Sequence, residues 1–382
     1  MSKPKFFIVT TVPATLGFFG RQCELLSEHF DVTAISSDSD SLVKFGQEWG
    51  VRTRSIPMKR EISLLSDIGC LCRFISLFAK EKPDMVHGNT PKGSLLSMLA
   101  AWITRVPARI YMCHGLRYQS CTGFKRRLLK FFERITCACA TDVICVSRGL
   151  AGVVRNDKLT GKDPVVVWNG SVCGIDPRKF NPDKAFDKEA LRARFGFTPE
   201  DYVLTYVGRI VKDKGIEELV EAFSVLSRRH RDMRLLLVGA IEEGNAISPE
   251  TRSALAGNTA IAAPGQLSDI PEVLAISDLF VFPSYREGFG MSLMEAGAME
   301  VPSIGTDIEG CNEVIENGRT GLLIKPRSVQ EIVDAVERLY NDKPLYDFLK
   351  SNCRSSIINR YDQQILLRKY SEYYFSHVQT LL

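Results

Sequence analysis

Two glutamates separated by seven residues, Glu287 and Glu295, flank a turn that contains Gly288 and Gly290. The pattern predicts a strand that ends at Pro283 and a helix that begins near Gly290. Glycines there let a ligand approach the backbone, and the helix N-terminus favours a phosphate. The two carboxylates can then bind sugar hydroxyls on either side of a diphosphate. A plain glycine turn with two solvated glutamates explains the same residues, so both interpretations stay open.

Two cations, Arg209 and Lys214, follow another expected strand and Gly208. An arginine contacts phosphate oxygens as a fork and a lysine as a point charge, so this pair can converge on one diphosphate. Two fixed cations at that place stabilise a departing nucleoside diphosphate without a metal ion. Solvated side chains of a basic loop are the alternative interpretation.

Alternating strands and helices along the whole chain must position these residues. Segments with helical periodicity, such as Arg21–Phe30 and Ile62–Lys82, separate short apolar runs, and the tail from Val329 to Leu382 is helical in pattern. This alternation is typical of βαβ units and parallel sheets. The expected strands are Phe6–Thr10, Asp31–Ser36, Arg52–Ile56, Met85–Asn89, Ala108–His114, Asp142–Ser147, Val165–Asn169, Tyr202–Gly208, Met233–Gly239, Asn258–Ala263, Asp278–Pro283, Val301–Thr306 and Gly321–Ile324.

Turn-forming residues clustered between Asn169 and Pro182 interrupt this pattern and indicate a linker. At 382 residues, the chain also exceeds what one hydrophobic core usually serves. We therefore expect two α/β domains with doubly wound parallel sheets, facing each other across a cleft that holds the ligands. The predicted parts are an N-terminal domain (1–170), a linker (171–185), a C-terminal domain (186–358) and a final helix (359–382) that packs back on the N-terminal domain.

The segment that starts at Glu287 reads Glu-Gly-Phe-Gly, four further residues, and then Glu-Ala. An expected strand and the turn Glu309-Gly310 follow it. This combination resembles the motif of family 4 retaining glycosyltransferases of the GT-B fold. The similarity runs over nearly the whole chain and is strongest from about Tyr202 to Pro326. It implies two Rossmann-like domains, the first binding the acceptor and the second binding the nucleotide sugar.

The resemblance assigns roles to the residues of the second domain. Glu287 contacts the hydroxyls of the donor sugar, Glu295 grips the ribose, and Arg209 and Lys214 hold the diphosphate. The remaining predicted donor-binding residues of this domain are Gly208, Leu267, Gly288, Phe289, Gly290 and Met291.

In the first domain, the backbone near Gly17 is predicted to lie against the donor phosphate, as the family's first glycine-rich loop does. Many members have adjacent glycines here, whereas this chain has Leu16 and Phe18 as neighbours, so a plain turn is the alternative. His114 ends an expected strand where the family often places a histidine. The resemblance implies a sugar contact or proton transfer for it, and a structural role is the alternative.

The acceptor side is predicted to be lined by Lys92, Arg117 and Tyr118, with the two cations meeting an acceptor phosphate. Solvated surface charge accounts for Lys92 and Arg117 equally well.

Charge is divided unevenly along the chain. Residues 1–170 hold 24 Lys and Arg against 14 Asp and Glu, although the net charge of the whole chain is only +4. A basic first half indicates an anionic partner, and we expect a membrane or phosphate rather than nucleic acid. The segment 124–135 carries an apolar face (Phe124, Leu128, Phe131, Phe132, Ile135) opposite a basic arc (Arg126, Arg127, Lys130, Arg134).

That segment resembles helices that lie on acidic membranes, and a core-packed helix with a solvated basic back is an equal alternative. No apolar run reaches the roughly 20 residues of a membrane span, and the N-terminus lacks a signal-peptide pattern. We therefore expect a cytoplasmic protein with peripheral contact to the inner membrane.

The predicted activity is transfer of a hexose or N-acetylhexosamine, with retention, from a nucleotide sugar to a glycan acceptor. A finer resemblance, carried by His114-Gly115-Leu116 and by Glu309-Gly310-Cys311, is to bacterial enzymes that build capsule, O-antigen or lipid-linked oligosaccharide. It implies a UDP-sugar donor, with GDP-mannose as the other candidate, and a polyprenyl-diphosphate-linked acceptor. No metal is expected, because the Asp-x-Asp pair at 38–40 lies far from a suitable loop.

Two other functions are weighed against this one. A UDP-sugar epimerase of the same fold needs extra carboxylates and histidines around the sugar, and the chain has only five histidines. A non-catalytic nucleotide-binding protein is disfavoured because Arg209, Lys214, Glu287 and Glu295 are all present. A dehydrogenase is less consistent still, since no strand precedes a Gly-x-Gly-x-x-Gly motif.

Overall fold

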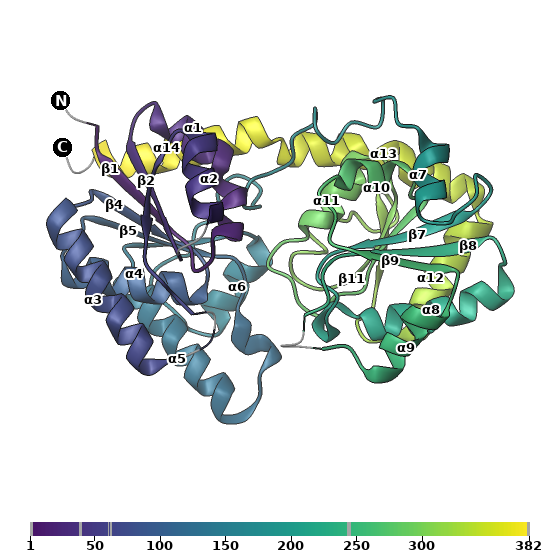
Figure 1. The fold of residues 1–382 in the computed structure, drawn as a ribbon, viewed down its shortest axis with the longest axis horizontal. Helices are drawn as coiled ribbons and strands as arrows, with labels where there is room; N and C mark the ends of the chain where they lie inside the picture. The colour runs from purple at the N-terminus through teal and green to yellow at the C-terminus, as the bar shows by residue number, and fades with distance from the viewer. Residues whose placement is uncertain (1–2, 38–39, 60, 62, 243–245, 380–382) are drawn as a thin grey trace. The chain divides into compact units, whose positions relative to one another are not determined.

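The computed structural model describes residues 3–37, 40–59, 61, 63–242 and 246–379. The chain forms two compact units, Met1–Gly174 with Gln363–Leu382, and Ile175–Asp362 (Figure 1). We call them the N-terminal and the C-terminal domain. The boundary at Gly174 falls inside the predicted linker 171–185, and the returning segment begins at Gln363 rather than at residue 359.

The N-terminal domain is built on a six-stranded parallel sheet in the order β3-β2-β1-β4-β5-β6. The central strands are almost fully buried, as expected for a parallel sheet with helices on both faces. Its strands are β1 (Lys5–Val9), β2 (Asp31–Ser36), β3 (Arg52–Ser55), β4 (Met85–Gly88), β5 (Ala108–Cys113) and β6 (Asp142–Cys145). Its helices are η1 (Pro13–Phe19), α1 (Gly20–Ser27), α2 (Asp40–Trp49), α3 (Leu64–Glu81), α4 (Pro91–Ile103), η2 (Arg117–Ser120), α5 (Gly123–Cys139), α6 (Arg148–Asn156) and α14 (Gln363–Gln379).

The C-terminal domain repeats this topology with the order β12-β11-β10-β7-β8-β9. Its strands are β7 (Tyr202–Val207), β8 (Met233–Val238), β9 (Ile261–Gly265), β10 (Leu279–Phe282), β11 (Ser303–Thr306) and β12 (Gly321–Ile324). Its helices are α7 (Lys188–Arg194), η3 (Lys212–Lys214), α8 (Ile216–Arg229), α9 (Pro249–Gly257), α10 (Ile270–Ala275), α11 (Met291–Ala298), α12 (Val329–Asn341) and α13 (Lys343–Tyr361).

Each sheet reverses its strand order at one place, between β1 and β4 in the first domain and between β7 and β10 in the second. In doubly wound sheets, ligands bind beyond the carboxyl ends of the strands at such a switch point. The loops that follow these four strands are therefore the part of each domain in which a site is expected.

The C-terminal helix α14 closes the N-terminal domain and lies beside α1 (Figure 1, yellow). Its Tyr374 is fully buried against Phe6 of β1, with ring centroids 5.3 Å apart. The hydroxyl of Tyr370 donates a hydrogen bond to the carbonyl of Ser171 at 2.8 Å. The last helix of the chain therefore completes the core of the first domain.

One predicted strand and one of the two interpretations of α5 are wrong. The predicted strand Val165–Asn169 is reduced to a single bridge between Val165 and Ile144, because Trp168 has a φ of 54° that ends extended backbone. On α5, the core-packed alternative does not hold for Phe124 and Phe131 of the apolar face, which are 79% and 56% exposed. The buried face of that helix is formed instead by Glu133, Thr136, Cys137 and Cys139.

Candidate active site

The loops after β7 and β10 touch at the switch point of the C-terminal domain. Gly215 has a φ of 69°, and a Cβ atom there would lie 2.1 Å from the carbonyl oxygen of Pro283. The backbone N–H of Tyr285 also donates to the carbonyl of Asp213 at 2.9 Å. Only glycine allows this approach, and the contact brings the two predicted motifs together.

Lys214 and Glu287, one from each loop, form an ion pair. Their side chains are only 14% and 11% exposed, and the ammonium lies 5.4 Å from the ring centre of Phe282. A pair so shielded from water interacts more strongly than a surface pair. The structure thus brings together two of the predicted catalytic residues.

Arg209 follows β7 as predicted, but its guanidinium is 57% exposed and contacts a different carboxylate. Its Nη1 atom lies 2.9 Å from Oε2 of Glu242, which precedes residues outside the described part of the chain. Arg209 and Lys214 therefore have separate carboxylate partners rather than a common one. Exposed pairs of the Arg209–Glu242 kind contribute little to stability and are readily exchanged.

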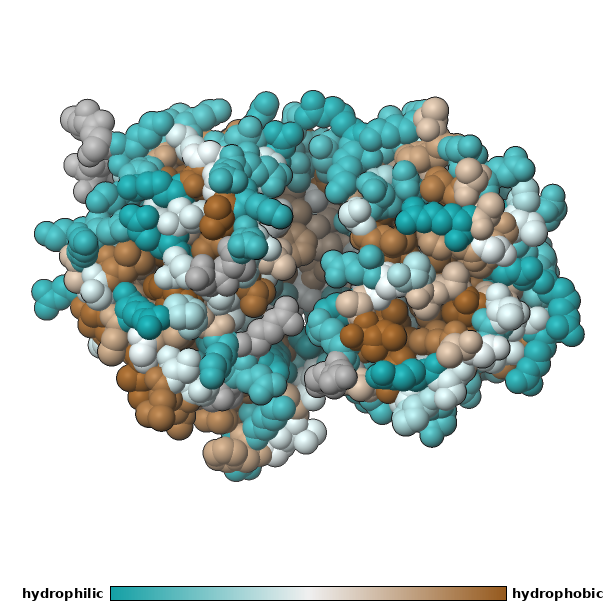
Figure 2. Space-filling view, in the orientation of Figure 1, coloured by the Kyte–Doolittle hydropathy of each residue, from teal (hydrophilic) through white to brown (hydrophobic). Residues whose placement is uncertain are grey.

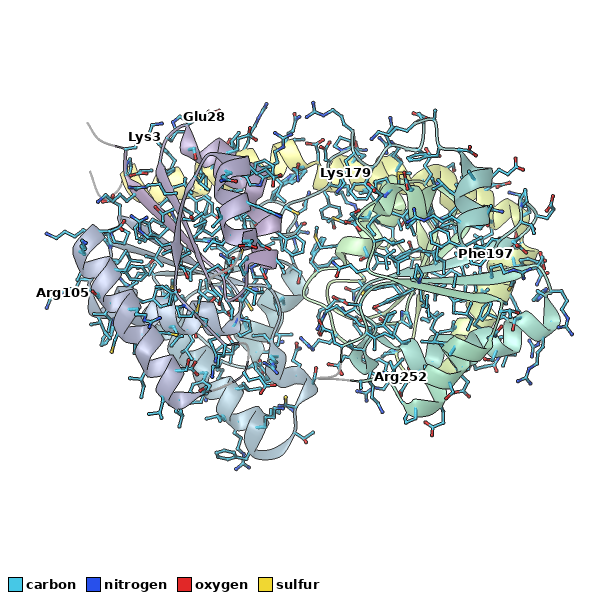
Figure 3. All side chains as sticks on the ribbon, in the orientation of Figure 1. Lys3, Glu28, Arg105, Lys179, Phe197 and Arg252 are labelled. Atoms are coloured by element: carbon cyan, nitrogen blue, oxygen red, sulfur yellow. The ribbon has the colours of Figure 1, made fainter. Side chains whose placement is uncertain are left out.

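Glu295 lies on α11, the helix that begins directly after the Glu287 loop. Its carboxylate has no hydrogen bond among the described residues, and burial raises its pKa to about 7, with Lys179 acting in the opposite direction. Figure 3 labels Lys179, whose side chain lies near α11. A sheltered carboxyl without a protein partner is suited to hydrogen bonds with ligand hydroxyls.

The predicted backbone donors before α11 divide into two groups. The N–H groups of Gly290 and Met291 already donate to the carbonyls of Gly310 and Phe289, at 3.0 and 2.9 Å. Those of Gly288 and Phe289 have no acceptor within the described residues. The ring of Phe289 packs inside the domain, 5.3 Å from Tyr361, so its contribution to a ligand site is confined to its backbone.

Three further predicted donor-binding residues, two glycines and one leucine, have different amounts of space around them. Gly208 has a φ of 156°, and a Cβ there would meet the hydroxyl of Tyr206 at 2.6 Å. Gly17 lies within η1 and has open space where a Cβ would be, so the local fold does not require glycine there. Leu267 faces α7 and α10, where it lines a cavity of about 30 Å³ that none of the other predicted site residues line.

In the N-terminal domain, the loops after β1 and β4 are tied together by two threonines. The Thr90 hydroxyl accepts the N–H of Thr11 at 3.0 Å, and the two hydroxyls are 2.7 Å apart. Thr90 has a φ of 66°, which is a strained conformation for a β-branched residue. Such strain is concentrated at functional sites, and here it lies at the switch point.

His114 follows β5 and belongs to a hydrogen-bond chain that reaches α14. The side-chain oxygen of Asn89 lies 2.9 Å from Nε2 of His114, and its nitrogen lies 2.9 Å from Nδ1 of His87. Nε2 of His87 is 3.0 Å from the hydroxyl of Tyr374, which also accepts from Gln22 at 3.3 Å. Five side chains are thus linked from the last helix to the edge of the sheet.

The donors and acceptors in this chain assign the tautomers. The Asn89 amide nitrogen also donates to the carbonyl of His87, at 3.3 Å, which fixes the orientation of the amide. His114 must then carry its proton on Nε2, and its Nδ1 is left as an acceptor. Burial lowers the pKa of His114 to about 4 and that of His87 to about 3, so both rings are neutral at pH 7.

The predicted acceptor residues have different surroundings. Lys92 is held by Asp67 at 2.8 Å and by the carbonyl of Glu61, whereas Arg117 is exposed and its guanidinium has no partner among the described residues. Tyr118 is fully buried, and its hydroxyl donates to Asp157 at 2.5 Å. The side chain of Tyr118 therefore supports the domain from within and does not line a surface.

Several polar residues of these sites were not identified from the sequence. Asn89 ended a predicted strand at the carboxyl edge of the sheet, and that position was the available signal. Tyr374 and Glu133 had no such signal, because their roles depend on contacts between segments distant in sequence. No group of three or more potential metal ligands occurs among the described residues, and Asp38 and Ser39 lie outside them.

Two family models match the chain, one on each domain. Residues 22–173 match the model described as Glycosyltransferase Family 4, and residues 187–356 match Glycosyl transferases group 1. The chain is 35% identical to the capsular polysaccharide biosynthesis glycosyltransferase CapM of Staphylococcus aureus, over 98% of this chain and 97% of that protein. It is 29% identical to the Escherichia coli UDP-Gal:alpha-D-GlcNAc-diphosphoundecaprenol alpha-1,3-galactosyltransferase, over 90% and 88% of the two chains.

Among solved structures, Anabaena Alr3699/HepE in complex with UDP and glucose superposes with a TM-score of 0.81, covering 98% of this chain and all of that one. At 18% identity this likeness establishes the fold. The fold and the predicted family are thereby confirmed, and the chain belongs to glycosyltransferase family 4, with the GT-B architecture of two Rossmann-like domains.

Proposed function

We propose that this glycosyltransferase transfers a hexose or N-acetylhexosamine from a UDP-sugar to a polyprenyl-diphosphate-linked glycan during synthesis of a bacterial surface polysaccharide. The observation that carries the proposal is the set of groups at the β7/β10 switch point, where Lys214, Glu287 and Glu295 surround the start of α11. The ammonium of Lys214 and the unpaired N–H groups before α11 can bind a diphosphate. The two carboxylates can accept hydrogen bonds from sugar hydroxyls.

The proposed reaction retains the configuration at the anomeric carbon and uses no metal. The bond between that carbon and the diphosphate oxygen breaks while the acceptor oxygen forms the glycosidic bond. The acceptor's proton passes to a phosphate oxygen of the departing nucleotide. Lys214 can donate to that phosphate while keeping Glu287, because an ammonium has three donors, and Arg209 exchanges its exposed partner Glu242 for the diphosphate.

In this reaction Glu287 binds sugar hydroxyls and Glu295 binds the ribose. Nδ1 of His114 is proposed to accept a hydrogen bond from a further hydroxyl of the transferred sugar. Because the ring is neutral at pH 7, this contact is an acceptor contact and not a proton donation.

The lipid-linked acceptor is inferred from the relatives. The Escherichia coli relative acts, by its name, on alpha-D-GlcNAc-diphosphoundecaprenol. A Campylobacter jejuni relative that is 28% identical is named for N,N'-diacetylbacillosaminyl-diphospho-undecaprenol. The relative that matches over nearly the full length is named for capsular polysaccharide. No helix within the described residues has both the length and the apolarity to cross a bilayer. Contact with the membrane that holds the lipid-linked acceptor is proposed to be peripheral.

A UDP-sugar epimerase of the same fold is the alternative activity. A Listeria monocytogenes structure described as a putative UDP-N-acetylglucosamine 2-epimerase superposes with a TM-score of 0.66 at 16% identity. That likeness concerns the fold alone. Conversion of UDP-N-acetylglucosamine without any acceptor would favour the epimerase.

The first test is thermal stabilisation by UDP, GDP, ADP and CDP, each with and without EDTA. A ligand at 100 times its dissociation constant adds about 2.7 kcal/mol of stability. We expect UDP to stabilise the wild type, EDTA to have no effect, and Arg209→Ala to lose most of the response. Arg229→Ala is the matched control, because Arg229 is 52% exposed and pairs with Glu337 at 2.7 Å.

Stabilisation by GDP alone would indicate a GDP-sugar donor instead of a UDP-sugar. No stabilisation by any nucleotide would contradict the proposal. The second test is transfer of labelled sugar from UDP-sugars to lipid-linked saccharides in excess EDTA. We expect full activity there. Loss of activity that Mg²⁺ or Mn²⁺ restores would contradict the metal-independent reaction.

A further inference from the structure

A cavity of about 370 Å³ lies within the N-terminal domain, enclosed by α3, α4 and α5. Most of its wall is apolar and comes from the three helices, including Leu71, Leu96, Leu129 and Phe132. Its volume is within the range of pockets that bury small organic ligands. Neither the donor site nor the acceptor sugar described above requires an apolar cavity at this place.

The rim of the cavity is also apolar. Leu64 and Ile68, on the first turns of α3, line it and are 72% and 58% exposed. Figure 2 shows brown surface at the lower left, at the end of α3 where these residues lie. Large apolar side chains gathered at the mouth of an apolar cavity mark an interaction site more strongly than scattered ones.

The polar part of the lining comes from the carboxyl edge of the sheet. Thr11 follows β1, Thr90 and Lys92 follow β4, and Arg117 follows β5. Arg117 has no partner for its guanidinium among the described residues, and α4, which is 13 residues long, begins between Thr90 and Lys92. Asp67 also lines this part of the cavity but pairs with Lys92 at 2.8 Å, so Arg117 and the N-terminus of α4 make this part of the cavity electropositive, next to the sheet edge on which His114 lies.

Glu133 is the polar group buried among the apolar walls. It is 7% exposed, and one carboxyl oxygen accepts the hydroxyl proton of Tyr111 at 2.7 Å. No cation pairs with it among the described residues. An anion would be repelled at that depth, so the charged group of an occupant must lie elsewhere, and the apolar walls around Glu133 favour an uncharged apolar segment there.

We propose that this cavity binds the isoprenoid segment next to the diphosphate of the acceptor, with the chain against the helices and the diphosphate toward Arg117. An apolar chain joined directly to a diphosphate complements a lining that is apolar on the helices and basic at the sheet edge. A flat bilayer surface does not reach the part of the cavity that lies between the three helices. The inference rests on the proposed function and adds to it a binding site for the lipid.

Farnesyl diphosphate is the probe, titrated calorimetrically into the full-length protein without vesicles. We expect it to bind at least tenfold more tightly than inorganic pyrophosphate, which carries the charge without the chain. Leu129→Trp fills the cavity and is expected to weaken binding at least tenfold. Leu65→Trp is the matched control, because Leu65 is 88% exposed on the same helix as the rim but does not line the cavity.

Arg117→Ala should weaken the binding of farnesyl diphosphate and the binding of pyrophosphate by the same factor. If Leu129→Trp fails to fold, as judged by its melting curve, Leu95→Phe replaces it. The proposal would be overturned if the two probes bound equally tightly. It would also be overturned if Leu129→Trp and Leu65→Trp lost the same amount of affinity for farnesyl diphosphate. If UDP stabilises the protein but farnesyl diphosphate does not bind, only the proposed lipid site is refuted. If both ligands bind but no sugar is transferred, the proposed function is refuted.

Discussion

At the scale of single residues, Lys214 combines a structural role with a proposed catalytic one. It neutralises Glu287 in a place that water hardly reaches, and in the proposed reaction it also faces the leaving diphosphate. Its removal thus affects both folding and chemistry. Sequence spacing indicated a cation here, but its pairing with Glu287 depends on the contact between Gly215 and Pro283 and could not be read from either motif alone.

Lys214→Ala is expected to reduce kcat/KM about 10²–10³-fold, the usual effect of removing one group that stabilises transition-state charge. It should also cost about 1–3 kcal/mol of stability, because Glu287 is left sheltered and unpaired. Steady-state kinetics and melting curves measure the two effects. Lys212→Ala is the control: Lys212 is in the same turn but 57% exposed, with Glu217 at 3.4 Å, and both quantities should stay near wild type.

Glu133 gives a prediction that depends on pH. Burial raises its pKa from 4.5 to about 7, although the hydrogen bond from Tyr111 opposes the shift. Between about pH 4.5 and 7 the folded protein therefore holds a proton that the unfolded chain has lost. The free energy of unfolding contributed by this group falls as pH rises through that window.

Glu133→Gln removes this titration while its side-chain oxygen can still accept from Tyr111. We expect the variant to match wild type near pH 4 and to be more stable by about 1–3 kcal/mol at pH 8. Urea unfolding at a series of pH values measures the difference. Glu28→Gln, at an exposed glutamate of the same domain labelled in Figure 3, should follow the wild-type curve. A constant offset at all pH values would contradict the assigned cause.

At the scale of elements, regular alternation made the strands predictable, since eleven of the twelve observed strands begin within two residues of the expected position and the other begins three residues later. Prediction from the sequence was wrong where tertiary contacts override the local pattern of residues. Trp168 turns the chain out of an expected strand. On α5, the apolar stripe was compatible with a membrane-facing or a core-packed helix; the helix buries Glu133 and leaves Phe124 exposed, whereas Phe132 of the same stripe lines the cavity.

The α14 helix illustrates a long-range dependence of this kind. Its Tyr374 satisfies the Nε2–H of His87, which in turn fixes Asn89 and His114. Tyr374→Phe leaves that donor buried without an acceptor and should destabilise the N-terminal domain by about 1–3 kcal/mol. Tyr373→Phe is the control, because its hydroxyl makes only a 3.4 Å contact with Asp142, and it should cost less than about 0.5 kcal/mol.

Both variants keep every group of the donor site, so a melting curve with and without UDP separates the effects. We expect the stabilisation by UDP to be unchanged in each variant while the melting temperature of Tyr374→Phe alone decreases. Equal destabilisation by the two variants would show that the hydrogen bond to His87 contributes nothing specific.

At the scale of the whole molecule, charge is divided between the domains. The N-terminal domain, including α14, holds 26 Lys and Arg against 15 Asp and Glu, whereas the C-terminal domain holds 23 against 30. A basic N-terminal domain is suited to the proposed acceptor, a lipid-linked glycan in an anionic membrane. On α5, Lys125, Arg126 and Arg127 are all exposed, so they are available to a membrane surface beside the exposed Phe124.

Binding to vesicles that contain phosphatidylglycerol should therefore exceed binding to neutral vesicles and should weaken as salt rises, because screening shortens the range of these charges. Each basic side chain near an anionic surface contributes about 1 kcal/mol, so replacing Lys125, Arg126 and Arg127 together by alanine should weaken binding roughly a hundredfold. Replacing Arg228, Arg229 and Arg231 of the acidic domain removes the same charge and should have little effect. Cosedimentation measures both triple variants, and an equal loss in the two would mean that net charge, and not the basic face of α5, holds the protein at the membrane.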